Sequence, residues 1–314
     1  MTLAAVWIEH RDKGNQPLCF ASDSRTTPGP IDGVTKVMLF GREDVAGVWA
    51  GDYRYATMLW AHLDAVFTST DAMRRRDVDL RRAFQQARKS VERHISAAIN
   101  PRILPFQENR EARLPEATTV LLGGWSVIET AYVLYRIDYR PAERRWRHHI
   151  EALEPDRAIF IGDGRARAKK RAKAIRKHRI AAARGWRMEP LAAIHLARDD
   201  PASDTVGGDL QMAKVFMHGS ARAFGFVEPI RDDRITVRAT EVNTRAAKEM
   251  AASALLVDLS AWVIDHGSYL AVRSYDGPPI RVSSVPAAGA AAPPDASWRR
   301  LIKALWRRRG TFGT

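Results

Sequence analysis

The opening stretch MTLAAVWIEHRDKGNQPLCFASDSRTTPGPIDGVTK, residues 1–36, decides the fold that we expect for this chain. Two apolar runs, 3–8 and 18–21, flank a polar turn, which is the pattern of a β-hairpin. A hairpin would return the acidic residue that follows the second run towards the start of the chain. One hydroxyl, one carboxylate and one amine are therefore expected to meet, those of Thr2, Asp23 and Lys36.

Position 2 suggests a specific chemistry. Threonine is small enough for methionine aminopeptidase to remove Met1, which would leave Thr2 with a free α-amine beside its own hydroxyl. A threonine paired with an N-terminal amine is a self-activated nucleophile. An α-amine titrates near ~8 in model peptides, so it can act as a base near neutral pH. Because Met-Thr is also a common way to begin a protein, these two residues alone do not define an enzyme.

Several segments in a fixed order resemble one protein family. They are Thr2, ASDSRT at 21–26, KV at 36–37, VAGVWAGD at 45–52, IFIGDG at 159–164 and DTVGG at 204–208. Together they resemble the N-terminal nucleophile (Ntn) hydrolases of the proteasome β-subunit type. The resemblance is greatest to the bacterial HslV-like and ancestral-β-subunit-like (Anbu-type) members, and it covers residues 2–217.

The resemblance implies a fold and a role for individual residues. The fold would be α+β, a four-layer αββα sandwich. Thr2 would attack a peptide carbonyl, Asp23 would orient Lys36, and Lys36 would lower the pKa of the Thr2 amine. The backbone N–H of Gly47 or of Gly51 would face the developing oxyanion. Both glycines stay open, because the segment that leads to them from Lys36 differs in length from the family pattern.

Further positions take supporting roles in the same comparison. Arg25 would brace Asp23, and Thr27 would offer its backbone to an extended substrate. The auxiliary positions around the Thr2 amine are Asp163, Asp204 and Gly207. Two of them depart from the family, because Asp163 and Gly207 stand where a serine is usual.

These features lead to one function and two alternatives. We expect a threonine-type peptidase that hydrolyses peptide bonds in peptides or unfolded proteins, within a homo-oligomer that closes as a ring or opens as a helix. The resemblance implies no metal and no organic cofactor. The first alternative is a catalytically inactive protein of the proteasome fold that binds or assembles through basic surfaces, which the departures at Asp163 and Gly207 favour. The second is a nucleic-acid-binding module. The basic patches of the sequence favour it, but the sequence contains no recognisable nucleic-acid-binding motif.

Composition narrows the setting. The only cysteine of the 314 residues is Cys19, which excludes a disulfide framework within the chain and fits a reducing compartment. The start shows no secretory signal pattern, and the apolar stretch 251–264 is too short to span a bilayer. We therefore expect a cytoplasmic protein.

The net charge of +14 is concentrated in two segments. Residues 139–187 hold 16 Lys/Arg and 5 Asp/Glu, a balance of +11, and residues 298–309 hold 6 Lys/Arg and no acid. Such patches indicate an acidic partner, a nucleic acid or an anionic membrane, while a solvated helix face is the alternative for the first patch.

The remaining pattern divides the chain into four parts. We expect an Ntn-hydrolase-like domain at 1–219, a small α+β extension at 220–285, a flexible linker at 286–297 and a basic amphipathic tail at 298–314. Within the first part we expect strands at 36–40, 45–50, 118–122, 128–137 and 158–161, and helices at 53–67, 79–99, 165–180 and 191–197. A turn at 123–126 would join two of the strands, Asp52 would cap the first helix, and the extension would hold a helix at 243–264.

Overall fold

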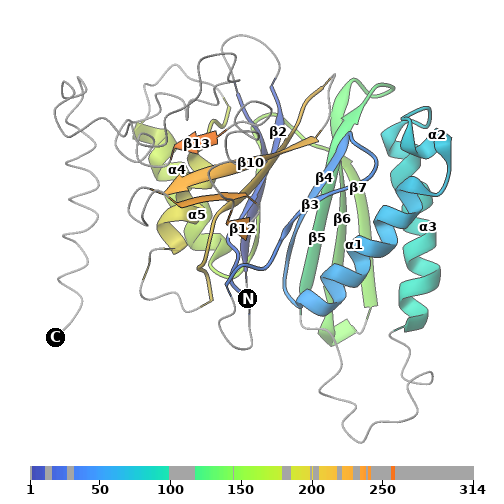
Figure 1. Cartoon of the computed structure of the whole chain (residues 1–314), viewed down its shortest axis with the longest axis horizontal. Coiled ribbons are helices and arrows are strands. Elements are labelled where there is room, and N and C mark those ends of the chain that lie inside the picture. The colour runs from blue at the N-terminus through green and yellow to red at the C-terminus, as the bar shows by residue number, and fades with distance from the viewer. Residues whose placement is uncertain are drawn as a thin grey trace, which may run out of the picture. The chain divides into compact units, whose positions relative to one another are not determined.

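The protein is described here from a computed structural model (Figure 1). The residues that it describes are 2–10, 16–26, 32–98, 117–143, 145–178, 185–198, 200, 205–217, 221–228, 234–237, 240–241 and 256–258. The chain forms two compact units. The first comprises Met1–Phe224 with Val237–Thr240, and the second comprises Gly225–Thr236 with Glu241–Thr314.

The opening hairpin lies at the centre of the first sheet. β1 (Leu3–Ile8) pairs antiparallel with β2 (Leu18–Ser22) on one side and with β8 (Ala158–Gly162) on the other. β2 in turn pairs with β9 (Gln211–Val215), which pairs with the first residues of β10 (Ala221–Glu228). The predicted hairpin is confirmed, and its two strands are covered on both faces, since every residue of β1 and β2 is buried.

Five antiparallel strands form the second sheet. In spatial order they are β3 (Val37–Leu39), β4 (Val45–Ala50), β5 (Thr118–Ser126), β6 (Ala131–Arg140) and β7 (Arg145–Ala152). A short 3-10 helix at Pro141–Glu143 lies between β6 and β7. This sheet follows the chain order, as expected for strands joined by short connections or by an excursion to one side.

The predicted turn at 123–126 is wrong. Gly123 and Gly124 lie inside β5, and the turn falls at 127–130, where Thr130 has a φ of +49°. A Cβ on Gly124 would lie 2.1 Å from the Asp44 carbonyl oxygen, so the glycine allows the backbones to approach closely. Adjacent glycines in a strand and adjacent glycines in a turn look alike in sequence, although the structural reason differs.

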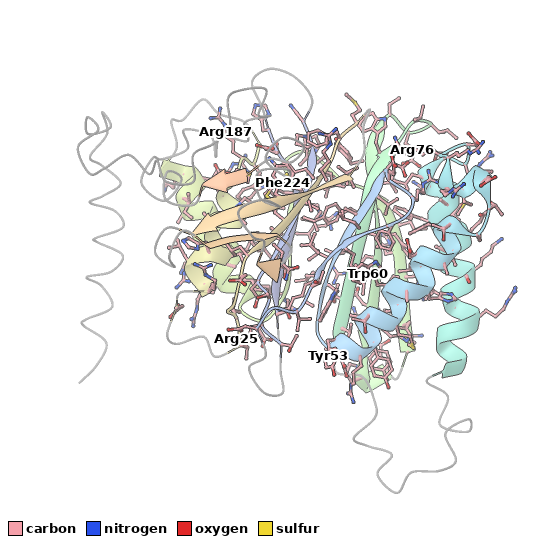
Figure 2. All side chains as sticks on the ribbon, in the orientation of Figure 1. Arg25, Tyr53, Trp60, Arg76, Arg187 and Phe224 are labelled. Atoms are coloured by element: carbon pink, nitrogen blue, oxygen red, sulfur yellow. The ribbon has the colours of Figure 1, made fainter. Side chains whose placement is uncertain are left out.

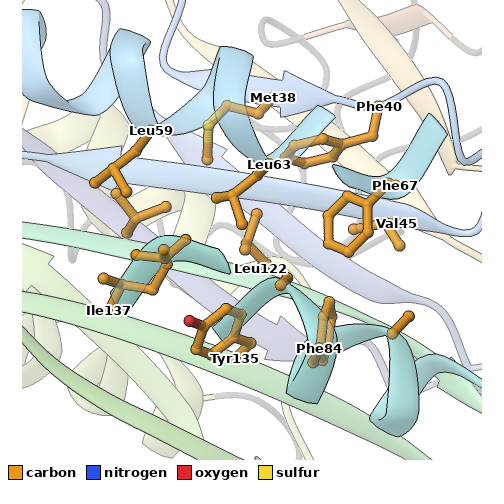
Figure 3. Close-up of a cluster of buried hydrophobic side chains, with 14 of the residues drawn as sticks. Met38, Phe40, Val45, Leu59, Leu63, Phe67, Phe84, Leu122, Tyr135 and Ile137 are labelled. Atoms are coloured by element: carbon orange, nitrogen blue, oxygen red, sulfur yellow. The ribbon is translucent and has the colours of Figure 1, made fainter. Parts of the chain in front are cut away.

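Two long helices cover the second sheet. α1 (Tyr53–Thr68) begins after Asp52, whose side chain accepts a hydrogen bond from the Arg54 N–H, so the predicted cap is confirmed. α2 (Asp71–Arg74) follows, and α3 (Leu80–Ala98) matches the predicted second helix. Figure 3 shows the apolar side chains between these helices and the sheet, which include Leu59, Leu63, Phe67, Phe84, Leu122, Tyr135 and Ile137. Each fully buried Leu or Phe side chain contributes about 1.5–3 kcal/mol, so this cluster is a major source of stability.

The first sheet is covered by α4 (Arg165–His178) and α5 (Glu189–Arg198). α4 turns the small side chains of Ala168 and Ala172 inward, which lets the helix lie close to β8 and α5. Both helices were predicted. Within the described part of the chain, no helix combines the length and the apolar content that a membrane crossing requires.

The two sheets share a second apolar cluster. It contains residues from both sheets, among them Ala4, Val6, Phe20 and Ile161 from the first and Ala46, Val48, Ala50 and Leu134 from the second. The first unit is thus a mixed α+β structure built on two antiparallel sheets that pack together.

In the second unit, residues of β10 pair in parallel with β13 (Leu256–Asp258), with Gly225 opposite Leu256. Two further short strands are β11 (Arg234–Val237) and β12 (Thr240–Glu241). The helix predicted at 243–264 is wrong at 256–258, where pairing with β10 overrides a helical spacing of apolar residues. The predicted linker at 286–297 and tail at 298–314 lie outside the described residues.

Candidate active site

Thr2 lies fully buried immediately before β1. Its carbonyl oxygen accepts a hydrogen bond of 2.8 Å from the Asp163 N–H, and its hydroxyl lies 3.5 Å from the Arg25 carbonyl oxygen. Gly162, at the end of β8, has a φ of +87°, and a Cβ there would lie 1.6 Å from the Thr2 carbonyl oxygen. Only glycine therefore allows the β8 backbone to close onto Thr2.

Asp23 follows β2, and its carboxylate is the centre of the site. Its Oδ1 accepts hydrogen bonds from the Leu3 N–H at 3.0 Å and from the Lys36 Nζ at 3.1 Å. Its Oδ2 accepts from the Gly207 N–H at 3.0 Å and from the Arg25 N–H at 3.3 Å. Four donors from separate segments thus hold one fully buried carboxylate in a single orientation.

Lys36 provides the positive charge beside this carboxylate. It is fully buried, and its Nζ also donates to the Arg25 carbonyl oxygen, which is the oxygen that the Thr2 hydroxyl approaches. Burial lowers the pKa of Lys36 from its ordinary value, while the charge and the hydrogen bond of Asp23 oppose that shift. The ammonium also lies 5.9 Å from the ring centre of Trp49. The structure therefore brings together all three residues, Thr2, Asp23 and Lys36, that the opening stretch predicts to meet.

Gln211 is a site residue that sequence reasoning missed. Its Oε1 accepts from the Lys36 N–H at 2.8 Å and from the Val37 N–H at 3.1 Å, and its Nε2 donates to the Val34 carbonyl oxygen at 2.6 Å. The side chain is fully buried in β9 and fixes the backbone on both sides of Lys36. A polar glutamine at the start of a short strand that is fully buried, Gln211–Val215, is the one signal in the sequence that pointed to it.

Ser24 is a second residue that was missed. Its hydroxyl oxygen accepts from the Asp209 N–H at 2.7 Å and from the Gly33 N–H at 3.2 Å. It ties the loop before Lys36 to the loop before β9. Three buried side chains, those of Asp23, Ser24 and Gln211, therefore fix the segments that carry Asp23 and Lys36.

Arg25 reaches Asp23 through its backbone. Its guanidinium instead forms two hydrogen bonds to Asp32, at 2.8 and 3.1 Å (Arg25 is labelled in Figure 2). The guanidinium also covers Gly207, because a Cβ at that glycine would lie 2.4 Å from the Arg25 Cζ. A serine at position 207 would thus displace the Arg25 side chain.

Of the remaining predicted auxiliary positions, the structure describes Asp163. Asp163 donates its backbone N–H to Thr2 and lies partly exposed just before α4. Thr27 and Asp204 lie outside the described residues.

Gly47 and Gly51 occupy different environments. Gly47 lies in the middle of β4, paired with Met38 of β3 and Leu122 of β5, so it belongs to the hydrogen-bond ladder. Gly51 follows the last pair of β4, is partly exposed and has a φ of +119°. The end of β4 also lies near Thr2, because a Cβ on Gly162 would lie 3.0 Å from the Ala50 Cβ and 1.6 Å from the Thr2 carbonyl oxygen.

No protein-family model matches the chain, and no curated protein matches its sequence. The geometry of the site is therefore the basis for assigning a function. Among the residues that the structure describes, no group of three or more His, Cys, Asp or Glu side chains is arranged to hold a metal ion.

Proposed function

We propose that this chain is a threonine-type peptidase in which Thr2, freed from Met1, is the nucleophile. The observation that carries the proposal is the Lys36–Asp23 pair, which is 3.1 Å long, fully buried on both sides and bound to the residue that follows Thr2. Removing two charges from water is costly, and such a pair adds little net stability. A buried lysine and carboxylate next to a threonine hydroxyl are therefore more consistent with chemistry than with packing.

The reaction begins with attack of the Thr2 Oγ on the carbonyl carbon of a peptide bond. The α-amine of Thr2 accepts the hydroxyl proton and returns it to the leaving amine as the peptide C–N bond breaks. The resulting ester is hydrolysed by water, with the same amine acting as the base. Thr2 regains its hydroxyl, so the step needs one water molecule for each bond cleaved.

Lys36 tunes this amine. A second positive charge close to the Thr2 amine disfavours the protonated amine and lowers its pKa. Asp23 holds the Lys36 side chain in place, and Gln211 fixes the backbone from which Lys36 extends. Burial lowers the pKa of Lys36, and the charge and the hydrogen bond of Asp23 oppose that shift.

The oxyanion is assigned to the backbone N–H of Gly51 in this proposal. Gly47 is bound into the ladder of β4, whereas Gly51 follows the ladder and lies at the strand end nearest to Gly162. A backbone donor that is fixed before the reaction stabilises developing charge without reorganisation.

The arrangement of the first unit also supports the proposal. α1 and α3 pack on the second sheet, α4 and α5 pack on the first, and the two sheets pack on each other. This order of helices and sheets is compatible with the αββα sandwich of the Ntn hydrolases, which we propose for the fold. The resemblance to the proteasome β-subunit type implies a homo-oligomer, and we propose the same for this chain.

A decisive experiment combines intact mass with covalent labelling. The purified protein should lack the mass of Met1, and a threonine-directed electrophile should add one label to Thr2. Thr2→Ala should lose the label and all turnover of fluorogenic peptides. Thr57→Ala, at an exposed hydroxyl on α1, is the matched control and should keep both. Equal turnover in Thr2→Ala and the unaltered protein would end the peptidase proposal.

A second candidate is a protein of the same fold that binds or assembles without cleavage. It is favoured by Asp163 and Gly207, which replace the usual hydroxyl groups around the amine, and by the complete burial of Thr2. It predicts that Met1 is retained, that no label is incorporated and that Thr2→Ala forms the same oligomer as the unaltered chain.

A further inference from the structure

The outer face of α4 is strongly positively charged. The helix holds eight Lys or Arg residues and no acidic residue. Arg167 and Arg171 lie 3.7 and 2.7 Å from Asp200, and Arg176 lies 3.7 Å from Asp156. Five further cations are exposed and form no ion pair with any residue that the structure describes, namely Arg165, Lys169, Lys170, Lys173 and Lys177.

Four of these five cations form a single row. Arg165, Lys169, Lys173 and Lys177 are spaced by four residues, so successive side chains lie one above the next along the helix. With a rise of about 1.5 Å per residue, the steps are about 6 Å each and the row is about 18 Å long. Each step joins two like charges, which destabilises the helix by roughly 0.2–0.5 kcal/mol. A bound polyanion would remove this cost.

We propose that this row of α4 binds the phosphate backbone of nucleic acid without reading its sequence. Duplex DNA presents one negative charge per about 1.7 Å of its axis, so a row of this length faces several phosphates at once. The sequence pI of about 10.3 and the clustering of lysines along one helix are the electrostatic features of such proteins. The surface lies on the solvent side of α4 and makes no use of the Thr2 hydroxyl.

The same face argues against two other acidic partners. Among the residues of α4 whose exposure the structure describes, the exposed apolar ones are Ala166 and Ala174, which are too small to anchor a helix in a lipid interface. A protein partner would need a buried apolar or aromatic centre, which the exposed cations of the row do not offer. Lysine also acts as a point charge that suits diffuse phosphate contacts, whereas bidentate recognition of carboxylates favours arginine.

The test measures binding of the full chain to a fluorescein-labelled DNA duplex of about 20 base pairs by anisotropy at several salt concentrations. In the test variant, Arg165, Lys169, Lys173 and Lys177 are replaced by Gln, which preserves helix propensity. In the matched control, four exposed arginines already paired with Glu143 or Glu151 are replaced by Gln, namely Arg140, Arg145, Arg147 and Arg157. Both variants lose four positive charges and keep the basic segment 298–309.

The α4 variant should bind at least about tenfold more weakly at 0.1 M salt. The slope of log K against log salt should fall by about 0.9 for each phosphate that the variant no longer neutralises, or about 3 to 4 in all. The control should change both quantities much less, and an unrelated duplex sequence should bind as well as the first. The proposal would be overturned if the two variants lost DNA affinity equally. It would also be overturned if the full chain bound phosphatidylserine vesicles or polyglutamate through the α4 row but did not bind DNA.

Discussion

Replacing Lys36 with Met tests the site most directly, because it removes one half of the buried ion pair while keeping side-chain volume. Removing one partner of a buried pair typically costs 3–5 kcal/mol, since a charge is left buried without its counterpart. Asp23 would keep three backbone N–H donors, those of Leu3, Arg25 and Gly207. We therefore expect a loss at the lower end, about 3 kcal/mol, together with complete loss of Thr2 labelling.

The protein offers a matched control for this change. Lys214 of β9 and Glu9 form a second buried pair, with an Nζ–Oε2 distance of 2.7 Å and both side chains almost inaccessible. Lys214→Met should lower the free energy of unfolding by a similar amount, because the same kind of pair is broken. It should leave the labelling of Thr2 intact, because Lys214 makes no contact with Asp23 or Lys36 in the structure.

Urea unfolding followed by circular dichroism gives the stability of each variant, and mass spectrometry after electrophile treatment gives the labelling. Labelling must be measured well below the unfolding midpoint of both variants, so that only folded protein is compared. The reasoning would be refuted by a Lys36→Met variant that loses less than about 1 kcal/mol or is labelled as fast as the unaltered protein. If both variants lost labelling alike, the reactivity of Thr2 would depend on the stability of the protein and not on Lys36 in particular.

Three other predictions concern packing, positioning and pH. Gly162→Ala should cost at least about 2 kcal/mol by chemical denaturation, from its φ and its clash with Thr2, whereas Gly164→Ala, with a φ of +68° and open space around it, should cost only about 1. Gln211→Met should slow Thr2 labelling more than it lowers stability, and a labelling rate equal to that of the unaltered protein would exclude a positioning role. Burial lowers the pKa of His148, so the folded state binds fewer protons than the unfolded state below pH 6.5 and stability should fall as pH drops through that window. His148→Phe should remove that fall in stability in denaturation curves recorded from pH 7 to pH 5. An unchanged pH dependence would show that His148 is not the group responsible for the fall.

The sequence departs at two positions, Gly207 and Asp163, from the pattern that it resembles. At Gly207 the Arg25 side chain occupies the space that a Cβ would take, so a serine there would displace Arg25, and the Gly207 N–H is one of the four donors to Asp23. Nothing in the structure explains why Asp163 carries a carboxylate.

The sequence by itself determined the elements that depend on local periodicity. The opening hairpin, α1 with its Asp52 cap, α3, α4 and α5 all follow from apolar spacing and capping residues, because these signals act within a few residues. The hairpin also predicted that Asp23 returns to the start of the chain. Local signals failed at Gly124, where close approach of a distant backbone mimics a turn signal, and at 256–258, where strand pairing overrides helical spacing.

Only the tertiary structure decided how the site is held. Gln211 lies 175 residues from Lys36 in the chain, and Gly207 lies 184 residues from Asp23, yet both are hydrogen-bonded to the site. No local pattern records which strands far apart in the sequence lie next to each other, because that order is set by the joint burial of both sheets and their helices. The buried environment that lowers the pKa of Lys36 has the same origin, since burial is a property of the packed layers and not of the residues around Lys36 in sequence.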